Sequence, residues 1–235
     1  MKQTFVLIHN PLFGPSTLAP TAEALKQKGH AASAPALAPA FAGGGPYYPK
    51  AAQIIADAGN SASEGVFLVA HGAAGPLVAA AAAASKAPVL GVILLSAIMP
   101  HANRAWLDTV PDEIKAQFAA IAKNGRLPAN DKMYPGQADA LRQQVGNPGV
   151  YTKLAAELIE LPLAYFEEAA PPNDAIKKTP IGYIQLSAAD QPRFDDATWM
   201  KWKTRQEISA DGFPTITKPE RVAAAIEAMA KDLRA

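Results

Sequence analysis

The sequence predicts an α/β protein, with a mainly parallel sheet flanked by helices and a helical lid inserted into the chain. Three observations support this fold class. The continuously apolar residues 5–8 and the mostly apolar residues 64–70 have the pattern of strands buried on both faces of a parallel sheet. Segments with helical periodicity alternate with these runs, as in βαβ units. From residue 101 to about 172 the strand pattern is absent and helical periodicity replaces it.

The first βαβ unit occupies the beginning of the chain. A buried strand over residues 5–8 ends at His9, and apolar residues at helical spacing predict a helix over residues 17–28. A second, weaker strand is expected near residues 31–34. Proline and glycine dominate residues 35–49, which favours an irregular loop that folds over the carboxyl edge of the sheet.

Three further elements continue the alternation up to residue 96. A helix is expected over residues 50–59 and a buried strand over residues 64–70. A tight turn over residues 71–75 leads into an alanine-rich helix over residues 76–85, whose small side chains permit close packing. A third clear strand follows over residues 89–96, so the core of the sheet is in place before the insertion begins.

We therefore expect one domain in which residues 1–100 and 176–235 form the α/β core and residues 101–175 form a helical lid. Helical periodicity predicts three helices in the lid, over residues 112–123, 137–144 and 151–160. The chain then returns to the core with strands over residues 180–187 and 206–209 and an amphipathic final helix over residues 219–233. Functional residues are expected just beyond the carboxyl ends of the strands.

Composition excludes several classes of function. Lys and Arg number 22 and Asp and Glu 21, and no basic run occurs, so nucleic-acid binding is not expected. The chain has no cysteine, which removes disulfides and thiolate chemistry and fits a reducing, cytoplasmic location. The apolar runs are broken by polar, glycine and proline residues before they reach membrane-spanning length, so we expect no membrane span.

The segment from Ala70 to Gly75 (AHGAAG) has the pattern of a nucleophile elbow. It follows a buried strand, opens a helix and has small residues around its centre, which a sharp, strained turn requires. Two other segments also resemble the α/β-hydrolase family: HNPLFGPS after the first strand and ADGFPTITKPERVAAAI near the end. With the elbow, these segments extend the resemblance over the whole chain. The elbow is similar to that of a bacterial branch of small hydrolases, His-Ser-x-Ala-Gly-Pro, at His71, Ala74, Gly75 and Pro76.

The resemblance implies that the serine nucleophile of the family corresponds to Gly72, and that the late histidine corresponds to Gly212. Neither glycine can supply the side chain. The four histidines are at positions 9, 30, 71 and 101, so none follows residue 101 to replace the late one. We therefore expect a degenerate catalytic triad that cannot form an acyl-enzyme at residue 72.

Without a serine, the elbow can still bind an anion through its backbone. Backbone N–H groups at the start of the following helix, beginning near Ala73, are expected to bind an oxyanion or a carboxylate. By resemblance, the second donor is the backbone of Asn10 or Leu12 in the loop after the first strand. Loss of the serine side chain is expected to enlarge the pocket at Gly72.

Several side chains are candidates for catalysis or ligand binding. Asp211, next to the position of the lost histidine, could act as a general base if burial raises its pKa; the alternative is a solvated turn residue. His9 could donate a proton to a substrate or could support the oxyanion loop. His101 directly follows a strand and a proline and could reach the pocket. Three lid aromatics could line an apolar pocket or belong to the core: Trp106, Tyr134 and Tyr165.

These observations predict a non-hydrolytic enzyme that binds a small apolar molecule under the lid. It would stabilise a developing oxyanion in a lyase, isomerase or cyclase step of specialised metabolism. The first alternative is a catalytically silent ligand-binding or interaction protein. The second is an esterase in which Asp211 or Glu167 activates water directly. We expect a small-molecule ligand, no cofactor, no metal, no nucleic acid and no membrane; the oligomeric state, a homodimer included, stays open.

Overall fold

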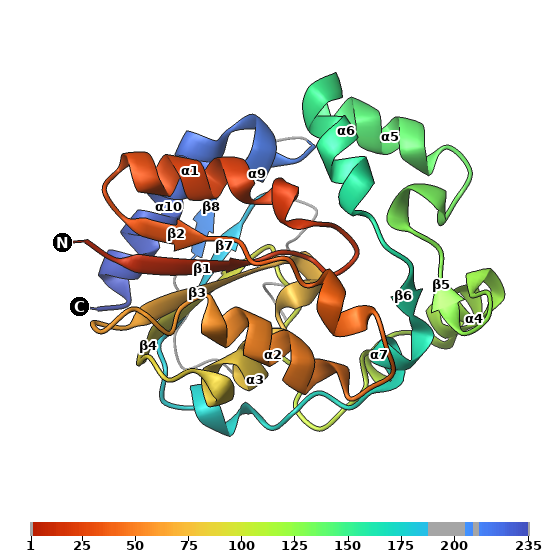
Figure 1. Ribbon diagram of the computed structural model, residues 1–235, viewed down its shortest axis with the longest axis horizontal. Helices are drawn as coiled ribbons and strands as arrows, with labels where there is room; N and C mark the ends of the chain where they lie inside the picture. Colours follow the sequence, from red (N-terminus) through yellow and green to blue (C-terminus); the bar gives the residue numbers. More distant parts are fainter. Residues whose placement is uncertain (1, 188–204, 209–211, 235) are drawn as a thin grey trace.

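The core of the molecule is a six-stranded parallel sheet in the strand order β2-β1-β3-β4-β7-β8 (Figure 1). The computed structural model describes residues 2–187, 205–208 and 212–234. The strands are β1 (Thr4–Ile8), β2 (Ala31–Ser33), β3 (Val66–His71), β4 (Val89–Leu95), β7 (Ile181–Gln185) and β8 (Arg205–Glu207). All strands run in one direction, so their carboxyl ends meet at one edge of the sheet.

The central strands are buried because helices cover both faces of the sheet. Along β1, Val6 and Ile8 pack into the apolar layer on one face, and Phe5 and Leu7 pack into the layer on the other. This alternation follows from the two-residue repeat of a strand, and all four side chains are fully buried. The continuously apolar sequence of β1 is therefore explained by two-sided burial.

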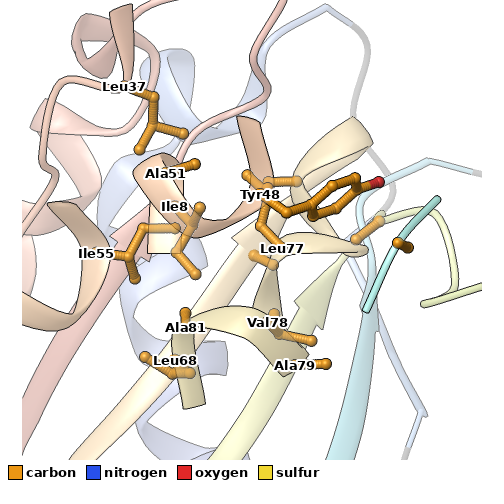
Figure 2. Close-up of a cluster of buried hydrophobic side chains, with 14 of the residues drawn as sticks. Ile8, Leu37, Tyr48, Ala51, Ile55, Leu68, Leu77, Val78, Ala79 and Ala81 are labelled. Atoms are coloured by element: carbon orange, nitrogen blue, oxygen red, sulfur yellow. The ribbon is translucent and has the colours of Figure 1, made fainter. Parts of the chain in front are cut away.

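Two pairs of helices form the outer layers. Helices α1 (Ala19–Gln27) and α10 (Pro219–Asp232) cover one face, and α2 (Tyr47–Asp57) and α3 (Leu77–Ala84) cover the other (Figure 1). Figure 2 shows the second layer, in which α2 and α3 pack against side chains from β1 and β3. The alanines of α3 keep its backbone close to the sheet and to α2, as their small size predicts.

The segment between β4 and β7 lies beside the carboxyl edge of the sheet (Figure 1). It contains α4 (Asp112–Ile121), α5 (Gln137–Val145), α6 (Pro148–Glu157) and α7 (Leu163–Glu167), together with the antiparallel pair β5 (Arg126–Leu127) and β6 (Leu161–Pro162). A small apolar cluster joins α5 and α6 to Phe13 and Phe213, which belong to loops of the core. The insertion is therefore held against the loops that follow the strands.

Short helices complete the described chain. One four-residue α-helix, α9 (Pro214–Thr217), precedes α10. The 3-10 turns are η1 (Pro15–Thr17), η2 (Ala38–Phe41), η3 (Gly72–Ala74), η4 (Trp106–Thr109), η5 (Asn130–Lys132) and η6 (Asn173–Ile176). Among the described residues, no helix combines the length and the apolar character that crossing a bilayer requires.

The predicted fold class is confirmed, and its elements occur in the predicted order. The predicted start of the second helix at Lys50 is wrong, because the carboxylate of Glu168 accepts hydrogen bonds from the N–H groups of Tyr47 (2.7 Å) and Tyr48 (2.9 Å) and caps the helix earlier. The short pair β5–β6 lies in a region where no strand was predicted, since two-residue strands leave no periodic pattern. The division at residues 100 and 175 stays a prediction.

Candidate ligand cavity at the carboxyl edge of the sheet

A cavity of about 600 Å³ lies at the carboxyl edge of the sheet, between the core loops and the insertion. Its core wall contains Asn10, Leu12, Phe13, Tyr48, His71, Gly72, Ala73, Pro76, Ser96, Ile98, Leu186, Ser187, Gly212, Phe213 and Pro214. Its other wall contains His101, Trp106, Phe118, Gln144, Tyr165 and Phe166 from the insertion. The volume is within the ~300–1,000 Å³ range of pockets that hold drug-sized molecules.

Gly72 directly follows β3 and has the left-handed backbone conformation of a sharp turn, with φ of +59°. A Cβ atom at this position would lie 2.8 Å from Nδ2 of Asn10 and 3.3 Å from Cβ and Cγ of the same residue. The expectation of an enlarged pocket at Gly72 is therefore wrong. The space that a side chain at residue 72 would need is occupied by the amide of Asn10.

Local hydrogen bonds hold Asn10 in this position. Its Oδ1 accepts from the N–H of Leu12 (3.0 Å), and its carbonyl oxygen accepts from the N–H of Phe13 (2.8 Å). Since Oδ1 is engaged on the Leu12 side, Nδ2 is the amide atom nearest to Gly72. The N–H of Leu12 already donates to Oδ1 of Asn10, so it is not available as the oxyanion donor that the sequence suggested. Asn10 itself and Ala73 remain as candidate donors in the cavity wall.

Gly212 also has a left-handed conformation, with φ of +75°, and lies in the cavity wall next to Phe213. A Cβ atom here would lie 2.6 Å from the carbonyl oxygen of Gln144, a backbone atom of α5. The ring of Phe213 meets that of Phe13 edge to face, with centroids 5.4 Å apart. A histidine at residue 212 would require α5 to move. Asp211, the predicted general base, lies outside the described residues.

His101 contributes to the cavity wall from the start of the insertion. Its Nδ1 lies 2.9 Å from the carbonyl oxygen of Arg104, which can only accept, so Nδ1 carries the proton and donates. Its Nε2 is buried and has no hydrogen-bond partner among the described residues. Burial lowers the pKa of His101, which favours the neutral ring with Nε2 as a proton acceptor.

His9 is bonded through both ring nitrogens to the backbone. Its Nδ1–H donates to the carbonyl oxygen of Asn10 (3.0 Å), and its Nε2 accepts from the N–H of Leu37 (3.1 Å). The side chain is buried behind the cavity wall, and burial lowers its pKa. Because no nitrogen remains for a substrate, the structural alternative for His9 fits this geometry and the catalytic one does not.

The predicted lid aromatics divide into two groups. Trp106 and Tyr165 line the cavity, whereas Tyr134 is 43% exposed in the turn before α5 and takes no part in its wall. The cavity also contains Phe118 and Phe166, which were not predicted as site residues. Phe166 follows Tyr165 directly, and Phe118 lies on the buried face of α4, so the helical periodicity of the insertion was the available signal.

Comparison with known proteins shows the fold of the chain. No family model and no curated protein matches the sequence. Among solved structures, a pyrethroid hydrolase from Sphingobium faniae aligns with a TM-score of 0.74 and 20% identity over 98% of both chains. The chain has the α/β-hydrolase fold. Tomato methylketone synthase I, in a histidine-to-alanine variant complexed with β-ketoheptanoate, aligns with a TM-score of 0.69 and 16% identity over 99% of this chain and 98% of that one.

A third neighbour is an extracellular α/β-hydrolase from a Paenibacillus species, described as sharing structural and functional homology with tobacco salicylic acid binding protein 2. It aligns with a TM-score of 0.70 and 15% identity over 96% of this chain and 98% of that one. In the α/β-hydrolase fold, ligands bind beyond the carboxyl ends of the strands, where the cavity of this chain lies. These three structural neighbours are two hydrolases and one synthase.

The charge of the cavity is the remaining feature of the site. None of the described side chains in its wall is Asp, Glu, Lys or Arg. Glu167, the other predicted water-activating base, is exposed and is not part of the wall. In the described part of the chain, no group of three or more His, Asp or Glu residues is arranged to hold a metal ion.

Proposed function

We propose that the protein is a non-hydrolytic enzyme of the α/β-hydrolase fold that acts on a small, mostly apolar molecule. The reaction is of the lyase, isomerase or cyclase type, with a developing oxyanion stabilised beside residue 72. The observation that carries this proposal is the contact between Asn10 and Gly72. An amide nitrogen takes the place beside the turn where a serine would need room for its side chain.

The donors beside Gly72 suit an oxyanion. Ala73 lies at the start of the turn after β3, where backbone N–H groups are not used by the helical hydrogen bonds. The Nδ2 group of Asn10 adds a side-chain donor on the other side of Gly72. A preorganised donor of this kind contributes about 2.7–4 kcal/mol to transition-state stabilisation where it has been removed by mutation.

His101 supplies the proton acceptor that such a reaction needs. The Arg104 carbonyl fixes its tautomer, so the lone pair resides on Nε2. A neutral imidazole in the cavity wall can remove a proton next to a substrate carbonyl, and Asn10 and Ala73 then bind the resulting enolate oxygen. No covalent intermediate with the protein is required. One fold neighbour is a methylketone synthase in complex with a β-keto acid, which supports a non-hydrolytic role on this fold.

The first experiment is ester hydrolysis. Purified protein is incubated with nitrophenyl esters of short and medium acyl chains, and nitrophenol release is compared with that of heat-denatured protein. We expect no turnover above this background, because residues 72 and 212 have no side chains. Turnover above background would contradict the non-hydrolytic proposal and would direct attention to Asp211.

The second experiment tests proton removal. Exchange of the α-protons of 2-heptanone and 2-acetylnaphthalene in deuterated water is followed by NMR. We expect faster exchange with the protein than in buffer, and a loss of about a hundredfold in the enzymatic rate in His101→Gln. His30→Gln is the matched control, since His30 lies outside the cavity wall.

If neither ketone exchanges faster than in buffer, the catalytically silent binding protein becomes the better proposal. The described wall is aromatic and has no charged side chain, which supports that candidate too, because such a wall suits binding as well as catalysis. A metabolite that copurifies with the protein and stays unchanged on prolonged incubation would favour it. Hydrolysis by directly activated water has less support, since Glu167 faces solvent.

A further inference from the structure

One wall of the cavity is built from aromatic rings in mutual contact. We call it the aromatic wall: Tyr48, Trp106, Phe118, Tyr165 and Phe166. Ring centroids lie 5.0 Å apart for Trp106 and Phe118, 5.3 Å for Phe118 and Phe166, and 5.0 Å for Tyr165 and Phe166. Tyr48 joins through Tyr165 at 5.7 Å. The contacts hold the rings as one preformed surface.

A second aromatic pair lines the cavity from two loops of the core. Phe13 comes from the loop after β1 and Phe213 from the loop before α10, and both line the cavity. A ligand in the cavity therefore meets aromatic rings from the insertion and from the core. Flat aromatic molecules gain offset-stacked and edge-to-face contacts with such rings, which saturated molecules of the same size do not.

The described wall has no charged side chain to neutralise an ionic ligand. Burial of an unpaired carboxylate or ammonium group in an apolar site costs more than its other contacts return. A neutral ligand meets no such penalty. The described wall therefore favours a neutral ligand over a charged one, and its donors beside Gly72 suit a carbonyl oxygen on which negative charge develops only during the reaction.

Two polar groups of the wall have complementary unused capacity. Asn10 accepts through Oδ1 from Leu12, and its Nδ2 donor group is directed to the Gly72 side. His101 donates through Nδ1 to Arg104, and its Nε2 acceptor has no partner among the described residues. In the proposed reaction Nε2 takes up the proton next to the substrate carbonyl, so a ligand that suits both groups needs a carbonyl oxygen for Asn10 and a C–H group next to that carbonyl for His101.

We infer that the ligand of this cavity is an uncharged, flat aromatic ketone. Its rings pack against the aromatic wall and the Phe13–Phe213 pair, its carbonyl oxygen accepts from Nδ2 of Asn10, and the C–H group next to the carbonyl faces Nε2 of His101. This inference rests on the proposed function, since it names the substrate class of the same site.

The test is calorimetric binding of two matched pairs of probes to the full-length protein at neutral pH. The first pair varies charge: 1-hydroxy-2-acetonaphthone against 1-hydroxy-2-naphthoate. The second pair varies aromaticity: 2′-hydroxyacetophenone against 2-acetylcyclohexanol. We expect the neutral naphthyl ketone to bind at least about tenfold tighter than the naphthoate. We expect the aromatic member of the second pair to bind about three- to tenfold tighter than the saturated one.

Three variants test which side chains contact the ligand. Phe166→Leu keeps the apolar volume and removes one ring, so it is expected to weaken 1-hydroxy-2-acetonaphthone about three- to tenfold. Asn10→Asp replaces the donor by a carboxylate and is expected to weaken it by more than about tenfold. Tyr134→Leu is the control, because it removes an aromatic ring of the insertion that is exposed and outside the wall.

The outcomes separate this inference from the proposed function. Tighter binding of the naphthoate, or equal binding of 2-acetylcyclohexanol and 2′-hydroxyacetophenone, would overturn the inferred ligand class and leave a ligand cavity in place. Failure of every probe to bind, aromatic, saturated or ionic, would overturn the ligand class and the proposed function together. An unchanged affinity in Asn10→Asp would remove the carbonyl contact from the inference.

Discussion

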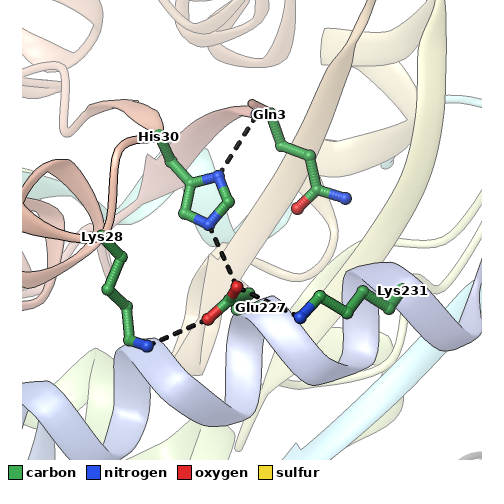
Figure 3. A network of polar contacts seen from close by, with 5 residues as sticks. All are labelled: Gln3, Lys28, His30, Glu227 and Lys231. Carbon is green, nitrogen blue, oxygen red and sulfur yellow. Dashed lines mark hydrogen bonds and ion pairs between the residues drawn. The ribbon is translucent and has the colours of Figure 1, made fainter. Parts of the chain in front are cut away.

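The two edges of the parallel sheet use polar groups in opposite ways. At the amino edge, beside the starts of β1 and β2, charged groups gather around Glu227 of α10. Its carboxylate lies 3.0 Å from Nζ of Lys28, 3.2 Å from Nζ of Lys231 and 3.6 Å from Nε2 of His30 (Figure 3). The ring of His30 is positioned by the N–H of Gln3, which donates to Nδ1 (3.2 Å). At the carboxyl edge, the described cavity wall has no charged side chain.

The difference supports the proposal that the carboxyl edge binds a ligand, whereas the ion pairs of the amino edge contribute to stability. At the amino edge, Lys28 and Lys231 pair with the carboxylate of Glu227, and this network ties the last helix to the segment between α1 and β2. In the described cavity wall at the carboxyl edge, the polar side chains are uncharged, and Nε2 of His101 has no partner among the described residues. An unsatisfied buried acceptor costs about 1–3 kcal/mol, and a bound ligand can recover this free energy.

The largest effect is expected for the aromatic wall. Phe166 is 4% exposed and contacts three rings, so Phe166→Ala should lower the free energy of unfolding by about 3 kcal/mol. The loss should be the same at low and high salt, because no charge is involved. Urea denaturation at two salt concentrations measures it. Tyr134→Ala, at an exposed ring, is the control, with an expected loss of at most about 0.5 kcal/mol. If the loss of unfolding free energy in Phe166→Ala depended on salt, the contrast between a charged amino edge and an uncharged cavity wall would be wrong.

The second effect concerns His9. His9→Phe leaves the N–H of Leu37 without its partner and removes one of the two hydrogen bonds to the carbonyl of Asn10, and it should cost about 2 kcal/mol. His9→Gln, whose amide can still accept from Leu37, should recover part of this loss.

The pH dependence of stability tests the same residue. Burial lowers the pKa of His9 below its ordinary value of 6.5, so the unfolded chain binds the proton more strongly. His9 therefore contributes stability above about pH 6.5 that is lost as the pH falls below it. His9→Phe should show a weaker decline over this range in urea denaturation. An identical pH profile would show that His9 does not titrate in this way.

The third effect concerns the turn at residue 72. Gly72→Ser places a side chain at φ of +59° and against Asn10, and should cost about 1–3 kcal/mol. It should not create esterase activity, since residue 212 is also glycine. The double variant Gly72→Ser/Asn10→Gly removes the crowding and should regain part of the stability. Detection by mass spectrometry of an acyl group on Ser at residue 72 would refute this expectation.

The smallest effect belongs to the amino edge. Lys28 and Lys231 lower the pKa of Glu227 from 4.5 to about 2. Its ion pairs therefore stabilise the fold above pH 4.5, and this contribution is lost as the pH falls toward 2. Glu227→Gln should cost no more than about 1 kcal/mol at neutral pH, because the pairs are solvent-accessible, and the loss should shrink with added salt. Glu64→Gln, at an exposed carboxylate, is the control. A loss that is insensitive to salt would contradict the assignment.

Much of the fold was predictable because its signals are local. Runs such as residues 5–8 identify buried strands, and the helical periodicity of residues 219–233 identifies the final helix. Helix boundaries were less predictable where a distant residue provides the cap. Glu168 is about 120 residues from Tyr47 and Tyr48, so the sequence around these tyrosines does not indicate that it caps the helix.

The features of the site also divide into those that the sequence determines and those that depend on the packing of the chain. The sequence by itself determined that residues 72 and 212 have no side chains, that no histidine follows residue 101, and that strands and helices alternate, because these are properties of single residues and of short-range periodicity. Only the tertiary structure decided that Asn10 fills the space beside Gly72, and that Gln144 closes the space beside Gly212. These contacts join residues more than 60 positions apart, and their geometry depends on the packing of the whole chain around one edge of the sheet.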